Sequence, residues 1–188
     1  MDQKKVVRLV LVLIGIFVIL YLMYQTWWYV REHSYDKEIR IVAAQYGISP
    51  YLVKAVVWRE SKFNRFCIGP TKDVGLMQIT EGAVKEWADA QKQPAPSKTE
   101  WFHAKTNLDI GAWYLARALQ RWKDCDNPVP FALAEYNAGR SNAAKWRAKC
   151  KSPNSSQEFI RNIGIASTRR YVQDVMAIEK KLERRGYL

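Results

Sequence analysis

The chain has 188 residues, a net charge of +12 and 48% hydrophobic residues. Its N-terminal stretch differs in composition from the rest, which leaves about 155 residues, enough for one globular domain with a single core. No nucleic-acid motif accompanies the positive charge, so we expect no nucleic-acid partner. An anionic polymer or a membrane surface fits the charge equally well.

An uncharged, mainly apolar stretch covers residues 9–30. About 20 such residues cross a bilayer as a helix. Because basic residues precede this stretch, we expect residues 1–8 to form a cytoplasmic tail and residues 34–188 to lie outside the cytoplasm. A cleaved signal peptide is the alternative, but its apolar region usually has only about 7–15 residues and ends at an A-x-A-like site, which is absent here. We therefore predict an uncleaved, single-pass signal anchor.

The remaining sequence predicts a mainly α domain, because apolar residues recur at helical spacing. In chain order, the predicted helices cover 35–46, 50–60, 81–87, 107–122, 128–138, 141–149 and 168–184. Ser34, Ser49, Thr80 and Asn127 are the predicted N-caps. Regular alternation is absent, and only residues 66–79 allow a short β-hairpin.

Three cysteines lie in the part of the chain that we expect to be exported to an oxidising compartment. Cys125 follows the long core helix and Cys150 follows the basic helix after Gly139, so we predict a Cys125–Cys150 disulfide. Cys67 would then be free, as a small buried apolar residue. No spacing of His or Cys suggests a metal site, and we expect no cofactor.

Glu60 is a carboxylate at a position where the helix pattern predicts an apolar residue. Val53, Val56 and Val57 form an apolar stripe, and Glu60 continues it one turn further. Burial disfavours the charged form and raises the pKa of a carboxyl group, and the negative end of the helix dipole acts in the same direction. A carboxylic acid that stays protonated near neutral pH can act as a general acid. The alternative is an ordinary surface Glu at the end of a helix.

Four short motifs accompany Glu60 in the sequence. In chain order they are Glu60-Ser61, the GLMQ segment 75–78, the YNAG segment 136–139 and the TR-x-YV segment 168–172. In this order and spacing they resemble the soluble-type lytic transglycosylase (SLT) domain, a goose-lysozyme-like family. The resemblance covers roughly residues 34–182. It implies a lysozyme-like helical fold and a place on the periplasmic side of a bacterial inner membrane.

The resemblance also implies the chemistry. Glu60 would protonate the glycosidic oxygen between N-acetylmuramic acid and N-acetylglucosamine in peptidoglycan, with help from the substrate's own N-acetyl group. The 6-hydroxyl of the muramic acid would then attack and give a 1,6-anhydro ring, with Glu60 as the base. The substrate-binding residues implied by the family are Ser61, Met77, Gln78, Tyr136, Asn137 and Tyr171.

Each of these residues has an expected role. Ser61 would add hydrogen bonds beside Glu60, and Met77 would keep the surroundings of Glu60 apolar. Gln78 would bond to sugar or backbone groups, and Tyr171 would reach toward Glu60. Tyr136 and Asn137 would line the groove. Plain core packing is the alternative for Met77 and the two tyrosines, and a cap or turn is the alternative for Gln78 and Asn137.

The sequence departs from the family in two places. Gly69 stands where many relatives have a serine, so a serine hydrogen bond to the sugar is in doubt, although Thr71 could replace it. Glu135 stands where many relatives have a small residue, and we expect it on the surface. Glycoside cleavage often uses two carboxylates. Asp73 is the nearest candidate for a second, and we expect it to be a turn residue.

Three other functions remain open from the sequence. A goose-type lysozyme would share the fold and Glu60 but would use water as the acceptor. A non-catalytic peptidoglycan-binding module would not need a carboxylic acid in an apolar pocket. A helical membrane scaffold unrelated to sugars would leave the four motifs as coincidence.

Overall fold

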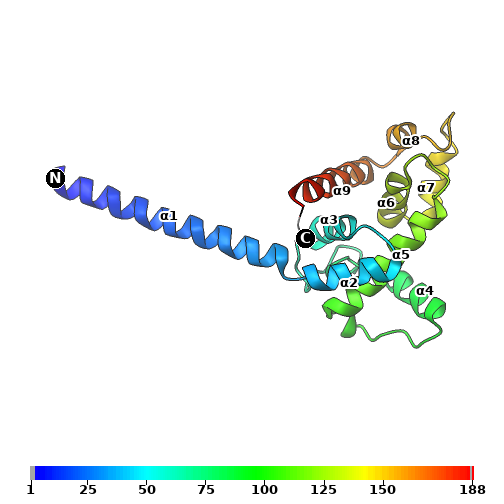
Figure 1. Cartoon of the computed structure of the whole chain (residues 1–188), viewed down its shortest axis with the longest axis horizontal. Coiled ribbons are helices and arrows are strands. Elements are labelled where there is room, and N and C mark those ends of the chain that lie inside the picture. The colour runs from blue at the N-terminus through cyan, green and yellow to red at the C-terminus, as the bar shows by residue number, and fades with distance from the viewer. Residues whose placement is uncertain (1–2, 187) are drawn as a thin grey trace. The chain divides into compact units, whose positions relative to one another are not determined.

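The computed structural model of the chain describes residues 3–186 and 188, and it divides after Ser34 into two compact units. The first unit is a single helix and the second holds the other helices (Figure 1). Met1 and Asp2, at the start of the predicted cytoplasmic tail, lie outside the described residues, as does Tyr187 in the predicted catalytic domain.

The first unit is the helix α1, Gln3–His33. The helical stretch Val7–Tyr46 contains an 18-residue window with a mean hydropathy of 2.6, and no residue of this window is buried. By length and composition, a helix of this kind can cross a membrane. Phe17, for example, is 70% exposed. Exposure of so many apolar side chains to water is unfavourable, so α1 needs an apolar environment. The predicted anchor, residues 9–30, lies within this helix.

The second unit is built from α-helices and one short 3₁₀ helix, as the sequence predicted. The elements are α2 (Asp36–Tyr46), α3 (Pro50–Ser61), α4 (Glu81–Gln91), η1 (Glu100–Phe102), α5 (Ala104–Arg121), α6 (Pro128–Ala138), α7 (Arg140–Arg147), α8 (Ser156–Asn162) and α9 (Ala166–Arg185). In Figure 1, α3 lies between α2 and α9, and it packs against both. The helix α6 packs against α5, α7 and α9.

The core follows from the apolar stripes of these helices. Val53, Val56 and Val57 of α3 are fully buried, which confirms the stripe that pointed to Glu60. On α5, an apolar stripe of Leu108, Gly111, Ala112, Leu115 and Ala118 is buried. On α9, Tyr171, Val175 and Leu182 are buried. The core therefore fixes α3 and α9 against each other along their lengths.

Three of the four predicted N-caps are confirmed. The side chains of Ser49, Thr80 and Asn127 accept hydrogen bonds from the backbone N–H groups of Leu52, Ala83 and Val129, at 3.2, 3.2 and 3.0 Å. The prediction for Ser34 is wrong. Its hydroxyl donates to the carbonyl of Val30 at 2.6 Å, because Ser34 ends the preceding helical segment instead of starting α2.

Several element boundaries differ from prediction. The helix α5 begins at Ala104, before Asn107, and α7 covers Arg140–Arg147 instead of 141–149. The helix α8 was not predicted, because its seven residues are too few to show a helical period. Within residues 3–186, the segment predicted as a hairpin has two isolated antiparallel bridges, Ile68 with Val74 and Val74 with Ile79, instead of paired strands.

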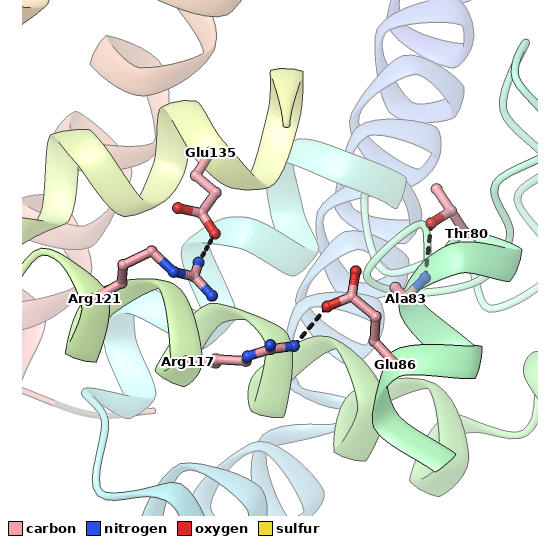
Figure 2. A network of polar contacts seen from close by, with 6 residues as sticks. All are labelled: Thr80, Ala83, Glu86, Arg117, Arg121 and Glu135. Atoms are coloured by element: carbon pink, nitrogen blue, oxygen red, sulfur yellow. Dashed lines mark hydrogen bonds and ion pairs between the residues drawn. The ribbon is translucent and has the colours of Figure 1, made fainter. Parts of the chain in front are cut away.

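The surface prediction for Glu135 is wrong. Glu135 is only 2% exposed on α6, and its carboxylate pairs with the guanidinium of Arg121 on α5, as Figure 2 shows. The indole N–H of Trp122 donates to the other carboxylate oxygen at 2.8 Å. A buried charge needs such partners, and here they join α5 to α6.

The cysteines also differ from the prediction. Cys67, Cys125 and Cys150 are free thiols in the structure, so the predicted Cys125–Cys150 disulfide is not formed there. The sulfur of Cys150 contacts the carbonyl of Trp146 at 3.5 Å and the amide of Asn162 at 3.6 Å. Cys125 instead lines a cavity with arginines of α5 and α7, including Arg147.

Candidate active site

Glu60 lies in the last turn of α3 and faces the first turns of α9. The hydroxyl of Tyr171 donates a hydrogen bond to Glu60 Oε1 at 2.7 Å. Next to this pair, Arg59 Nε donates to Asp174 Oδ2 at 3.2 Å. Because Arg59 precedes Glu60 whereas Asp174 follows Tyr171, the two helices run antiparallel here. The predicted contact between Tyr171 and Glu60 is therefore present.

Burial sets the protonation of Glu60. Burial raises the pKa of Glu60 to about 7, against an ordinary value of 4.5. The hydrogen bond from Tyr171 and the charge of Arg59 lower this pKa, and the charge of Asp73 raises it. Burial outweighs the hydrogen bond because removing a carboxylate from water disfavours its charged form most. Glu60 can thus hold or release a proton near neutral pH.

Ser61 connects α3 to the GLMQ segment. Its hydroxyl oxygen lies 3.1 Å from the carbonyl oxygen of Val57 within α3, and 2.9 Å from that of Leu76. Ser61 is buried, so both contacts are shielded from water. The predicted local hydrogen bonds are present, and they tie the segment 75–78 to the end of α3.

The GLMQ segment depends on a close approach at Gly75. Gly75 has φ +85°, and a Cβ there would lie 2.0 Å from Nδ2 of Asn107. Asn107 accepts a hydrogen bond from Met77 N at 2.8 Å and donates to the carbonyl of Val74 at 2.9 Å. It also donates to the carbonyl of Trp101 at 2.8 Å. Only glycine allows the Asn107 side chain to reach these backbone groups.

Gln78 uses its amide inside the loop. Its Nε2 donates to the carbonyls of Cys67 at 3.1 Å and Gly75 at 2.9 Å. Gln78 also has φ +49°, in the left-handed region. We predicted that this amide would bond to sugar or to backbone groups. In the structure it bonds to backbone carbonyls.

Tyr136 contacts the GLMQ segment at Met77. The Tyr136 hydroxyl donates to the carbonyl of Met77 at 2.7 Å. Burial, followed by the charge of Glu60, raises the pKa of Tyr136 well above its ordinary value. The Met77 side chain is fully buried against α5, where a Cβ at Gly111 would lie 2.5 Å from Met77 Sδ. Packing of Met77 beside Glu60 stays a prediction.

Asn137 is exposed at the end of α6. Its Oδ1 accepts a hydrogen bond from the hydroxyl of Thr168 at 2.8 Å. Because Oδ1 is held in this way, Nδ2 is the atom of the amide that this hydrogen bond leaves as a donor. The expected place of Asn137 in the wall of the groove stays a prediction.

The loop before GLMQ explains the departure at Gly69. A Cβ at Gly69 would lie 2.2 Å from Asp73 Oδ2 and 2.6 Å from Gln78 Oε1, so a serine would not fit without movement. The hydroxyl of Thr71 donates to Asp73 Oδ1 and is therefore not free to replace the missing serine. Asp73 is held by the turn, as predicted, and it is also near enough to raise the pKa of Glu60.

Sequence reasoning missed Asn107, Arg59 and Asp174 as residues of this site. Asn107 was considered only as a helix start, although it is a polar residue in register with the apolar stripe of α5. That mismatch was the available signal. Among residues 3–186 and 188, no three His, Cys, Asp or Glu side chains form a group that could hold a metal ion.

The comparison with known proteins now gives the family. The Transglycosylase SLT domain family matches residues 37–159 of the chain. The chain belongs to this family. Of the curated relatives, the membrane-bound lytic murein transglycosylase C of Shigella sonnei is 27% identical, over 82% of this chain and 48% of the relative. The SLT chain thus spans about half the length of that protein.

Solved structures show the same fold for this SLT domain. An inactive mutant of lytic transglycosylase Slt from Pseudomonas aeruginosa superposes with a TM-score of 0.72 at 23% identity, over 80% of this chain and 25% of that one. The 70 kDa soluble lytic transglycosylase of Escherichia coli gives 0.70 at 25% identity, over 77% of this chain and 23% of that one. The predicted lysozyme-like helical fold is confirmed.

Replacing Tyr171 by Phe should raise the pKa of Glu60. The lost hydroxyl stabilises the charged carboxylate, so its removal should move the pKa upward from about 7 by roughly one unit. A ¹³C NMR titration of the Glu60 carboxyl measures this. Tyr136→Phe is the matched control, because that hydroxyl bonds to a carbonyl of Met77 and not to Glu60. An unchanged or lower pKa in Tyr171→Phe would contradict the assigned hydrogen bond.

Proposed function

We propose that the SLT chain is a membrane-anchored peptidoglycan lytic transglycosylase. It would cleave the β-1,4 bond between N-acetylmuramic acid and N-acetylglucosamine and form 1,6-anhydro-N-acetylmuramic acid. The observation that carries this proposal is the state of Glu60, a carboxyl with a pKa of about 7 that is held by Tyr171. The printed names of the relatives, lytic murein transglycosylases, support the choice of substrate.

The first step uses Glu60 as an acid. Its protonated carboxyl transfers the proton to the glycosidic oxygen, the bond from that oxygen to the muramic acid breaks, and the N-acetylglucosamine leaves as an alcohol. The N-acetyl oxygen of the muramic acid stabilises the positive charge that develops. A pKa near the working pH suits this transfer, because the acid form is populated and still gives up its proton readily.

The second step uses the same side chain as a base. The Glu60 carboxylate accepts the proton of the 6-hydroxyl as that oxygen bonds to the anomeric carbon, which closes the anhydro ring and restores the protonated acid. The Tyr171 hydroxyl bonds to the carboxylate, so it supports the charged state that exists between the two steps. Ser61, Met77 and Gln78 would shape the floor of the groove, and Tyr136 and Asn137 its wall.

The lysozyme alternative rests on Asp73. Its charge raises the pKa of Glu60, so a second carboxylate does lie within electrostatic reach. However, Asp73 Oδ1 accepts a hydrogen bond from Thr71, and Asp73 Oδ2 lies against Gly69. These contacts hinder Asp73 from acting as a nucleophile. We therefore favour the mechanism with Glu60 as the only acid and base.

The anchor would place this chemistry outside the cytoplasm. We propose that residues 9–30 stay attached and cross the inner membrane, with residues 1–8 in the cytoplasm and the domain 34–188 in the periplasm. The basic residues before the apolar stretch support this orientation. N-terminal sequencing of the mature protein tests it. A mature chain that starts beyond residue 30 would contradict the anchor.

Release of glycan from purified sacculi tests the proposed activity. The full chain in detergent should convert insoluble sacculi to soluble muropeptides. Binding to sacculi without any release would instead favour the non-catalytic binding module. If the protein neither binds sacculi nor releases glycan from them, this result would contradict peptidoglycan as the substrate.

A further inference from the structure

A cavity of about 580 Å³ opens at the end of the α3–α9 pair that is remote from Glu60. Its walls come from the end of α2, the start of α3, α5, the start of α6 and the second half of α9. Ser49 at the start of α3 lines it, and Ser49 is 11 residues from Glu60, or about 16 Å along the helix axis. Its size is in the range of ligand pockets, roughly 300–1,000 Å³.

Glu179 is the acidic residue that lines this cavity. Burial, followed by the charge of Glu183, raises the pKa of Glu179 to about 7, while a side-chain hydrogen bond with Ser49 lowers it. Among the described residues, no lysine or arginine pairs with its carboxylate. A half-buried carboxylate without a cationic partner is unfavourable, and a bound cation would relieve it.

The basic residue of the cavity, Arg117, is already neutralised. Its Nη1 lies 2.5 Å from Glu86 Oε2 on α4, as Figure 2 shows. Its guanidinium carbon also lies 5.2 Å from the ring centroid of Trp113. Arg117 is thus committed to Glu86 and Trp113 and is not available to an anion. The charge of the cavity that has no cationic partner is therefore that of the Glu179 carboxylate, when this carboxyl is ionised.

The remaining walls are largely apolar. Trp113 and Tyr46 supply aromatic surface, and Leu119 and Val129 supply aliphatic surface. A carboxylate beside an aromatic ring is the usual environment for an organic ammonium group, which bonds to the carboxylate and lies near the ring. The aliphatic walls favour an ammonium carried on a chain of several methylene groups.

We propose that this cavity binds the primary ammonium group of a diamino-acid side chain in the peptidoglycan stem peptide. The inference rests on the proposed function for its choice of ligand. The ammonium pairs with Glu179, and the methylene chain packs between Trp113 and Leu119. Because the cavity lies about 16 Å from Glu60 along α3, it holds a stem peptide while the glycan occupies the catalytic site. The enzyme then favours peptide-bearing strands over bare glycan.

Isothermal titration with a sugar-free stem peptide tests the inference. The full chain in detergent is titrated with a peptide that has a free side-chain amine, and with the same peptide acetylated on that amine. We expect acetylation to weaken binding about tenfold or more, because it removes the charge that pairs with Glu179. Glu179→Gln should weaken binding of the free-amine peptide to the same extent. Thermal unfolding checks that this variant is folded.

Two control variants locate the bound peptide. Glu183→Gln removes a neighbouring exposed charge and should change the affinity little, and Glu60→Gln should not change it. Equal affinity for the free and acetylated peptides, or a loss in Glu60→Gln but not in Glu179→Gln, would overturn the inference. Glycan release is measured in the same preparations. An active enzyme that does not bind the peptide would overturn the inference and leave the proposed function intact.

Discussion

Replacing Glu60 by Gln should lower the rate of glycan release by a factor of about 10²–10⁴ or more. Gln keeps the size and shape of the side chain but has no proton to give to the glycosidic oxygen, and no carboxylate to take one from the 6-hydroxyl. Release of soluble muropeptides from sacculi, at equal concentrations of folded protein, measures the effect. Turnover like that of the wild type in a folded Glu60→Gln protein would refute the assignment of Glu60.

The same variant should reveal the cost of burying Glu60. The pKa of Glu60 is about 7 in the folded protein and 4.5 in its ordinary state. The protonated carboxyl therefore contributes stability that is fully present below pH 4.5 and is lost as the pH rises through 7. Glu60→Gln should thus gain stability relative to the wild type between pH 5 and pH 8. Glu179 titrates similarly in both proteins, so the difference between them isolates Glu60.

Replacing Asn107 by Ala should destabilise the domain by roughly 3–5 kcal/mol. The buried amide forms three hydrogen bonds, to Met77 N and to the carbonyls of Val74 and Trp101. Alanine would leave these backbone groups without partners in a space too apolar to satisfy them. The loss is a large part of the total stability of a typical domain, about 5–15 kcal/mol. Denaturant unfolding in detergent measures it.

An exposed asparagine supplies the matched control. The side chain of Asn64 accepts one hydrogen bond, from Phe66 N at 3.1 Å, and water can replace it. Asn64→Ala should therefore cost less than about 1 kcal/mol. If Asn107→Ala were as mild as Asn64→Ala, Asn107 would not be the residue that holds the GLMQ segment.

The local part of the site could be predicted from the sequence. Ser49 and Pro50 mark the start of α3, and the valine stripe makes the position of Glu60 unusual, because these signals lie within one helix. The family resemblance carried by the four motifs then implied Tyr171, on a helix 111 residues away, as a partner of Glu60, and the structure has that contact. Short-range signals and motif spacing were sufficient here.

The errors concern contacts between elements. Glu135 was expected on the surface because it lies on a different helix face from Tyr136, yet its burial depends on Arg121 and Trp122, which α5 brings to it. Asn107 has a local signal, as a polar residue among apolar ones, but its partners lie 6 to 33 residues earlier and this signal does not identify them. Nothing local in the sequence pairs either residue with its partners, so the fold is needed to reveal these contacts.

The central claim is that Glu60 acts alone, with the substrate's own hydroxyl as the acceptor. Mass spectrometry of the muropeptides that the full chain releases from sacculi tests this most directly, because the anhydro product is lighter than the hydrolysis product by one water. We predict that the released ends are 1,6-anhydro-N-acetylmuramic acid and do not react with sodium borohydride. Mainly reducible ends would contradict the claim, because water would then be the acceptor, as in a lysozyme.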